Sequence, residues 1–265
     1  MDPGRAMPRF LMLVALAALV GGCATPGRGG APPAPPPALP AGPEAPAAPP
    51  ATAAAPQAPA AAAVPVDPEV NERFAGSYRG AAKTSYAQQG GAPAPLEPFA
   101  DLVALRDFLA PQLDAVMKAR YPHLSKQGGG ADHRVPEERH NVTVDGYLHA
   151  VKHENGAKGD RDFHLMLGSS AVAGGGIFMT AEASALPAGG SQRAQLAQAR
   201  EQLLSIIGTC RCEGKFMRVS PPIRVRVAGS LLFDGQHAAA SVGPSYAKPF
   251  SVWEIHPIAS IERLD

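Results

Sequence analysis

The 265-residue chain lacks the motifs that would assign it at once to a common class of enzyme. It has no GxSxG elbow, no HExxH pair and no glycine-rich phosphate loop followed by a helix. Charge of one sign is also lacking, because 24 basic residues face 23 acidic ones and the net charge is +1. No strong field would therefore recruit a polyanion. These absences favour a binding or structural role over an enzyme.

A long hydrophobic run is absent as well. The N-terminal apolar stretch Phe10–Val20 has 11 residues, whereas a membrane-spanning helix needs about 20. Two arginines precede this stretch, and two glycines and Cys23 follow it, which is the order of a cleaved secretory signal. The sequence therefore predicts a signal peptide over residues 1–22. Ordinary secretion with an unmodified cysteine is the alternative.

The run Val20-Gly21-Gly22-Cys23 is similar to the lipobox of bacterial lipoproteins. The resemblance implies that Cys23 is the first mature residue and carries lipid, which would anchor the protein to a membrane. Ala24 stands where an aspartate would favour inner-membrane retention in enterobacterial lipoproteins. We therefore expect a lipid-anchored protein of the bacterial cell envelope, at the outer membrane and facing the periplasm or the surface.

Residues 23–68 are almost entirely alanine, proline and glycine. This composition offers no periodic apolar face, so it predicts a disordered linker biased toward an extended, polyproline-like conformation. At about 3.1 Å per residue, such a linker would hold a domain on the order of 100 Å from its anchor. A leader with no spacing role is the alternative.

Cysteine is scarce, and only Cys210 and Cys212 follow Cys23. In an oxidising compartment these two can form a disulfide across one intervening residue. Two thiols without a second pair are a poor signal for zinc. We expect a small disulfide or two inert thiols, and we predict no cofactor and no metal from this pair.

Residues 69–130 are predicted to form a helical accessory segment. Pro111 falls inside its apolar pattern and predicts a kink or two short helices, and three glycines at 128–130 mark its end. Apolar residues recur there at three- and four-residue steps, and we expect this face to cover the following domain. The face comprises Phe99, Leu102, Leu105, Leu109, Leu113 and Val116.

Residues 131–265 carry five stretches of alternating apolar and polar residues, with a helical stretch at 192–207 after the third. Strand, strand, strand, helix, strand, strand is the order of an OB-fold. The sequence predicts a mainly β, five-stranded OB-fold-like barrel with a bulge or bend at Gly146. The expected strands are 142–150, 163–167, 177–182, 223–233 and 253–261.

Four strings in this region resemble an uncharacterised group of secreted bacterial proteins with an OB-fold-like domain that ends in a Glu-x-His-Pro run. They are VTVDGYLHAVKHE, DFHLML, RVRVAGSLLFDGQH and WEIHP, and they span residues 142–257. The resemblance supports the fold and implies no activity. The usual ligand face of the fold lies on the second and third strands, beside the loops 154–161 and 235–251.

Histidine and carboxylate side chains supply the clearest chemistry in the predicted barrel. Asp162 and His164 are two residues apart on an expected strand, so they share a face. A metal ion needs three or four such ligands, and Glu182, His237 and His256 complete a set only if the strands bring them together. Polar histidines satisfied by their neighbours are the favoured interpretation.

Nucleic-acid binding is the common use of an OB-fold, but residues 131–265 hold 14 basic and 14 acidic residues. Arg224, Arg226 and Tyr147 are too few to form a basic groove with a stacking surface. We therefore expect no nucleic-acid partner.

The sequence as a whole predicts an envelope lipoprotein that presents an OB-fold-like binding or structural module on a proline-rich spacer. Its expected partner is an envelope protein or a cell-wall component, and its oligomeric state is open. A metal-assisted hydrolase that uses the His/Asp face of the barrel and an oligonucleotide-binding domain are the alternatives. The candidate ligand-binding residues are Tyr147, His149, Asp162, His164, Arg224, Arg226, His237 and His256.

Overall fold

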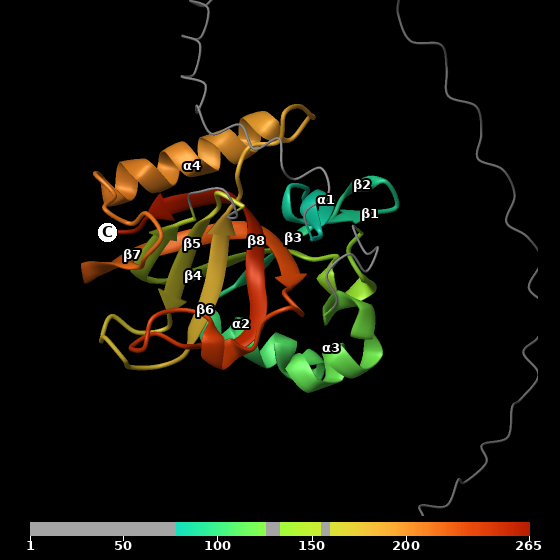
Figure 1. Cartoon of the computed structure of the whole chain (residues 1–265), viewed down its shortest axis with the longest axis horizontal. Coiled ribbons are helices and arrows are strands. Elements are labelled where there is room, and N and C mark those ends of the chain that lie inside the picture. The colour runs from blue at the N-terminus through green and yellow to red at the C-terminus, as the bar shows by residue number, and fades with distance from the viewer. Residues whose placement is uncertain (1–77, 126–132, 155–159) are drawn as a thin grey trace, which may run out of the picture. The chain divides into compact units, whose positions relative to one another are not determined.

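Five strands close into a barrel in the part of the chain that the computed structural model describes, residues 78–125, 133–154 and 160–265 (Figure 1). Around the barrel the order is β4-β5-β6-β8-β7, and β7 pairs with β4 to complete the closure. β6 and β8 run parallel, and the other neighbouring barrel strands are antiparallel. The strands are β4 (Asn141–His153), β5 (Phe163–Gly168), β6 (Phe178–Ala183), β7 (Met217–Phe233) and β8 (Pro249–Arg263).

The predicted chain order of the barrel is confirmed. Helix α4 (Arg193–Ile207) lies between β6 and β7 in the sequence, which completes the β-β-β-α-β-β order of an OB-fold. Its buried face comprises Leu196, Ala199 and Leu203, and it packs mainly against β8. Gly208 ends the helix with a φ of 65°, a backbone angle that favours glycine.

Alternation along each strand separates the core from the outer surface of the barrel. In β7, Val225, Val227 and Leu231 are fully buried, whereas the side chains of Arg224 and Arg226 are 50% and 49% exposed. The side chains of a strand point alternately to its two faces, so an apolar-polar alternation encodes a sheet with one buried face.

The irregularity in β4 does not lie at Gly146, where the sequence predicted a bulge. The register shifts between Leu148 and Ala150 instead. A Cβ atom at Gly146 would lie 3.3 Å from the backbone oxygen of Gly168 and 3.5 Å from the Leu102 side chain. This glycine therefore permits close packing of β5 and of a helix on the strand.

Pro111 divides the N-terminal helical segment, as predicted. Helices α2 (Leu102–Leu109) and α3 (Asp114–Arg120) are separated by a 3₁₀ turn that contains this proline. Asp101 caps α2, because its Oδ1 accepts hydrogen bonds of 2.9 Å from two backbone N–H groups of the first turn.

The apolar face predicted for this segment continues only as far as the turn. Leu102, Leu105 and Leu109 are fully buried in the main core of the barrel. Leu113 and Val116, by contrast, are 38% and 41% exposed. Leu113 has an extended backbone between the two helices, with φ −69° and ψ 169°, so a single helical stripe does not continue from one to the other.

Shorter elements complete the described chain. β3 (Leu96–Phe99) pairs in parallel with β4, so Phe99 belongs to a strand and not to the helical face where the periodicity placed it. β1 and β2 form a small antiparallel hairpin. These elements are α1 (Gly80–Lys83), β1 (Gln88–Gln89), β2 (Ala92–Pro93) and the 3₁₀ turns Ala110–Gln112, Pro122–Ser125, Pro136–Glu138 and Ala239–Ser241.

Two buried arginines join the segments before β4 to the barrel. Arg79 donates to both carboxylate oxygens of Glu138, at 2.6 and 2.5 Å. Arg134 donates to the carbonyl oxygens of Ala82 and His256, each at 2.7 Å. Buried guanidinium groups are tolerated only when their donors are satisfied in this way. The contacts hold α1 against β8.

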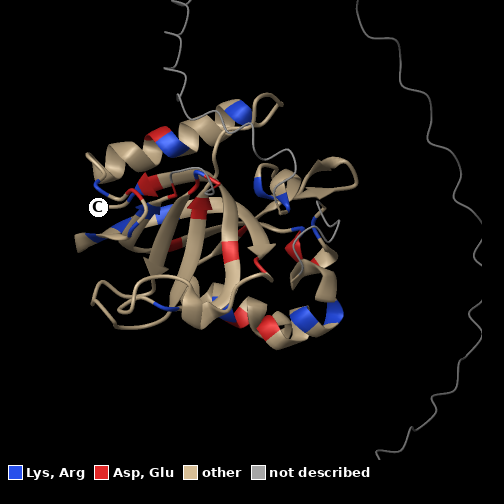
Figure 2. Cartoon of the chain, in the orientation of Figure 1, with Lys and Arg blue, Asp and Glu red and all other residues tan. Residues whose placement is uncertain are grey.

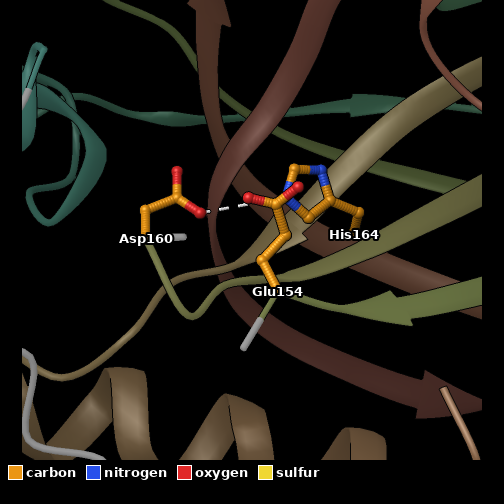
Figure 3. Close-up of side chains that lie close together, drawn as sticks. All are labelled: Glu154, Asp160 and His164. Atoms are coloured by element: carbon orange, nitrogen blue, oxygen red, sulfur yellow. Dashed lines mark ion pairs between the residues drawn. The ribbon is translucent and has the colours of Figure 1, made fainter. Parts of the chain in front are cut away.

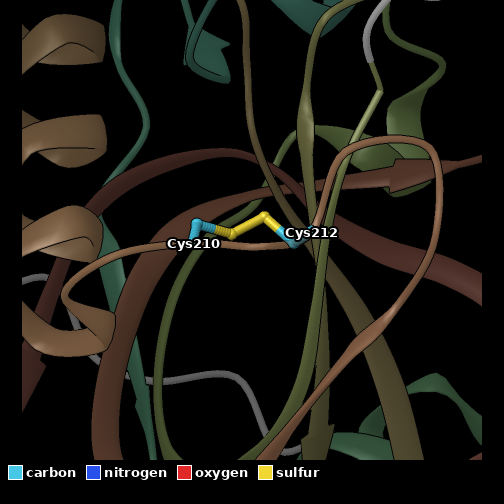
Figure 4. The surroundings of a disulfide bond; sticks show 2 residues. All are labelled: Cys210 and Cys212. Atoms are coloured by element: carbon cyan, nitrogen blue, oxygen red, sulfur yellow. A yellow bond between two sulfur atoms is a disulfide. The ribbon is translucent and has the colours of Figure 1, made fainter.

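Cys210 and Cys212 are joined by a disulfide in the connection between α4 and β7, with their Cα atoms 5.2 Å apart (Figure 4). The carbonyl oxygen of Cys212 accepts a hydrogen bond of 2.9 Å from the N–H of His153. The connection is thereby attached to the end of β4.

Several sequence predictions fall outside the described residues. They are the signal peptide at 1–22, the lipidation of Cys23, the linker at 23–68 and the glycine break at 128–130. Among the described residues, no helix is long and apolar enough to cross a membrane.

The docking of α2 on the barrel can be tested by comparing two truncations. Leu105→Ala removes a fully buried side chain and should lower the free energy of unfolding by about 2–5 kcal/mol. Val116→Ala, at a site 41% exposed, should change it by less than about 1 kcal/mol. Urea denaturation of both variants provides the measurement. Equal losses would contradict the packing described for α2 and α3.

Candidate functional site

Ionisable side chains gather on the outer face of three neighbouring strands, β5, β6 and β8. His164 of β5 lies directly opposite Glu182 of β6, and Glu254 and His256 lie on the same face of β8. Figure 2 marks the carboxylates on β6 and β8. Their inward-pointing neighbours, such as Ile255, belong to the barrel core, so the alternation that builds the core also directs these polar groups outward.

These strands form one wall of a pocket of about 220 Å³. Lys83 of α1, Lys152 of β4 and residues of the β4–β5 and β7–β8 connections supply the other groups around it. Five carboxylates, two lysines and two histidines line the pocket, so ionised carboxylates outnumber the cations by one even when both histidines are protonated. The charged and titratable lining groups are Glu154, Asp160, Glu182, Asp234, Glu254, Lys83, Lys152, His164 and His237.

His256 lies beneath the pocket and is completely buried between carboxylates. Its Nδ1 is 3.0 Å from both Glu182 Oε2 and Glu254 Oε1, and its Nε2 is 3.3 Å from Asp162 Oδ2. Burial alone would lower the pKa of His256, but Glu182 and the other two carboxylates outweigh burial and hold that pKa well above its ordinary value. His256 is therefore an imidazolium ion that neutralises part of the buried acid.

The carboxylates around His256 differ from one another in proton affinity. Burial and the charge of Glu182 raise the pKa of Glu254 to about 7. Burial would raise the pKa of Glu182 too, but the two histidines beside it, His164 and His256, lower that pKa well below the ordinary range. Glu182 is thus a permanent carboxylate, whereas Glu254 exchanges a proton near neutral pH.

His164 bridges the buried carboxylates and the open side of the pocket. Its Nδ1 is 2.6 Å from Glu182 Oε1, and its Nε2 lies 3.7 Å from Glu154 Oε1 and 4.0 Å from Asp160 Oδ1. Figure 3 shows the side chains of Glu154, Asp160 and His164 facing one another. Burial would lower the pKa of His164, but Glu182, Asp160 and Glu154 outweigh burial and raise it to about 9.

Two lysines balance part of the acid. Lys83 of α1 donates to Asp160 Oδ2 at 3.0 Å, and Lys152 of β4 donates to Glu154 Oε1. Burial would lower the pKa of Lys83, but the nearby carboxylates, Asp160 foremost, raise it well above its ordinary value. At the rim, His237 Nδ1 pairs with Asp234 Oδ2 at 2.5 Å.

The structure brings together half of the residues that the sequence singled out. His164 and His237 line the pocket, and Asp162 and His256 lie directly beneath it. His149 is buried elsewhere, where its Nε2 contacts the carbonyl oxygen of Ser170 at 2.7 Å.

The remaining candidates lie on the outer face of β4 and β7. Tyr147 is paired in register with Arg224. Arg226 donates through Nε to Asp145 Oδ1 at 2.7 Å, and its NH1 lies 3.4 Å from Glu262. Arg224 lies 3.5 Å from the same aspartate. These arginines are engaged by acidic neighbours and do not belong to the pocket.

Several pocket residues were not singled out from the sequence. Glu254 precedes His256 by two residues, and this i, i+2 spacing on a strand is a signal that could have identified it. Lys83 offers no such signal, because 77 residues separate it from its partner Asp160. Only the docking of α1 on the barrel places this lysine at the site.

Two groups of side chains among the described residues have the composition and spacing of metal ligands. Glu154, Asp160 and His164 form one group, and Asp162, Glu182 and His256 form the other, with ligand atoms in each group within 4.8 Å of one another. The metal site considered from the sequence required Glu182, His237 and His256 to join Asp162 and His164 in one set. The structure brings Glu182 and His256 to Asp162, but it places His164 in the other group and His237 in neither.

Comparison of the chain with protein-family models, with curated proteins and with solved structures finds no match. The functional argument therefore depends on the fold and on the chemistry of the pocket.

The raised pKa of His164 predicts a pH dependence of stability. Folding raises this pKa from 6.5 to about 9, so the folded protein holds the proton more tightly than the unfolded chain. The stabilisation is complete below pH 6.5 and is lost as the pH rises toward 9, with an upper magnitude on the order of 3 kcal/mol. Glu254 adds the same trend at lower pH, because its pKa is raised from 4.5 to about 7.

The measurement is urea denaturation at several pH values in the presence of a chelator. His164→Gln should flatten the decline between pH 6.5 and 9, whereas His123→Gln, at an exposed site outside the pocket, should leave it intact. Stability that rises over this interval in the unmodified protein would contradict the assignment.

Proposed function

We propose that the chain is a binding module of OB-fold type that captures a positively charged group in the acidic pocket on β5, β6 and β8. One observation carries this proposal: in a pocket of about 220 Å³, five carboxylates face two lysines and two histidines, so acid is in excess by one charge even with both histidines protonated. The excess of carboxylates gives the cavity a negative potential. A cation that enters it would exchange water for oxygen ligands already held in place.

The position of the pocket supports the same proposal. β5 and β6 are the second and third strands of the barrel, and OB-folds bind their ligands on the face of these strands and in the neighbouring loops. The raised pKa values of His164 and His237 agree with a negative potential, since neighbouring carboxylates make each group hold its proton more tightly than in water. The same field would attract another cation.

Oligonucleotide binding is poorly supported by this geometry. Phosphate groups would meet an excess of carboxylates in the pocket. On the outer face of β7, Arg224 and Arg226 contact Asp145, and Arg226 also contacts Glu262. Phosphate contacts need clustered positive charge that is available to the ligand, and these side chains already share their charge with acids.

We further propose that the module works at the cell envelope, held there by lipid on Cys23. The support comes from the sequence alone: the short apolar stretch, the lipobox-like run before Cys23 and the alanine- and proline-rich residues that follow it. A tether of this kind would let the pocket meet an envelope protein or a cell-wall component that carries amines.

Spermidine is a suitable probe of the pocket because it carries only positive charge at neutral pH. Glu154→Gln removes one pocket carboxylate that is 29% exposed, and it should weaken spermidine binding about fivefold, as expected for about 1 kcal/mol of lost attraction. Glu262→Gln, on β8 outside the pocket and 59% exposed, should change it less than about twofold. Calorimetry at low salt provides the measurement. No binding, or equal weakening by both variants, would count against the pocket.

Lipidation of Cys23 predicts that the protein from its bacterial host incorporates a labelled fatty acid and sediments with membranes. Cys23→Ser should abolish both properties, because serine has no thiol to carry the diacylglycerol. Cys212→Ser is the matched control and should keep the label. A Cys23→Ser protein that still labels and sediments with membranes would exclude this anchor.

A further inference from the structure

We propose that the pocket contains a binding site for one divalent transition-metal ion of the zinc type, with His164 Nε2, Glu154 and Asp160 as its protein ligands. This inference rests on the proposed function of the pocket and names the cation. It arises from the way three side chains from the β4–β5 region meet at the open side of the cavity (Figure 3).

The spacing of the ligand atoms fits such an ion. Zinc binds histidine nitrogen at about 2.0–2.1 Å and carboxylate oxygen at about 2.0–2.2 Å in a tetrahedron, so its ligand atoms lie roughly 3.3 Å apart. His164 Nε2 is 3.7 Å from Glu154 Oε1 and 4.0 Å from Asp160 Oδ1. All three ligand atoms lie within 4.8 Å of one another, so they need to approach one another by at most about 1.5 Å to form a coordination shell.

His164 is oriented in the manner of a metal ligand. Its Nδ1 contacts Glu182 Oε1 at 2.6 Å, and Glu182 in turn contacts the buried His256 at 3.0 Å. A carboxylate on one ring nitrogen fixes the tautomer and directs the lone pair of the other nitrogen at the metal. Nε2 is buried and makes no hydrogen bond with any described residue, although it faces two carboxylates.

A lysine pairs with each of the two carboxylate ligands. Lys83 holds Asp160 through Oδ2 at 3.0 Å, while Oδ1 is the atom nearer to His164. Lys152 donates to Glu154 Oε1, so a bound ion would displace this lysine and the proton on His164. Lys152 keeps its charge and is 22% exposed, so it can turn toward solvent when the ion takes its place.

The second group of potential ligands is less suited to an ion. Asp162 and His256 are fully buried, and neither lines the pocket. Both ring nitrogens of His256 already face carboxylates within 3.3 Å. A metal site needs an entry path and a free ligand atom, so this group acts as a support beneath the proposed site.

The mixed ligand set restricts the class of ion. Imidazole suits zinc, copper, iron and nickel, whereas magnesium and calcium prefer sites made only of oxygen. Three protein ligands leave a fourth position on the pocket side for water or for a donor atom of a ligand. The site would thus combine a metal ion with space for a second molecule.

Isothermal titration of the metal-free, full-length protein with zinc chloride at pH 8 tests the inference. We expect one ion per chain, and His164→Ala should weaken zinc binding at least 100-fold. His140→Ala is the matched control, because His140 also contacts a carboxylate, Glu97 at 2.6 Å, but lies outside the pocket. It should bind zinc as the unmodified protein does. Cobalt substitution should give the intense visible absorption of a tetrahedral site.

Spermidine binding separates the metal inference from the proposed function. The unmodified, metal-free protein is titrated with spermidine for this purpose, and circular dichroism shows whether His164→Ala is folded. If it does not fold, Glu154→Gln, nearer the surface, takes its place and should weaken zinc binding at least tenfold.

Spermidine binding without zinc binding would overturn the metal site and leave the cation pocket intact. Binding of neither would overturn both. Equal zinc loss in the His164 and His140 variants would place the ion elsewhere and overturn the inference.

Discussion

The burial of acid on one face of the barrel is the constraint on which the rest of the site depends. Three carboxylates surround the fully buried His256 within 3.3 Å, and an unpaired buried charge would be far too costly to retain. The imidazolium ion, His164 and Lys83 together compensate the acid.

The segment before β4 supplies one of the cations that compensate this acid. α1 brings Lys83 to the pocket, and α1 is held there by buried arginines that bind Glu138 and backbone carbonyl groups. α2 independently buries three leucines in the barrel core. The segment before β4 thus contributes one of the charged groups of the site and covers the core, so we regard it as part of the working unit.

The chemistry of the pocket also explains why an OB-fold topology need not indicate nucleic-acid binding. The topology supplies a face on the second and third strands, but side chains decide what this face attracts. Here histidines and carboxylates occupy it, and the histidine-carboxylate pairs resemble the supporting contacts of metal ligands. The same barrel that elsewhere presents basic and aromatic groups presents oxygen and imidazole donors in this chain.

Local pattern alone predicted the barrel strands, α4 and the break between α2 and α3, but not α1 or the short strands β1, β2 and β3. Alternation predicted the five strands, the 3.6-residue period predicted α4, and Pro111 predicted the break between α2 and α3, because each signal depends on neighbours in the chain. The bulge after Leu148 and the exposure of Val116 were not predictable in this way, since they depend on packing against other elements. In the site, sequence spacing grouped Asp162 with His164, but the structure places Asp162 beside His256 and His164 beside Glu182. Strand pairing brought Glu182 to His256. Only tertiary docking brought Lys83 to Asp160, because its position is set by contacts between residues far apart in the sequence.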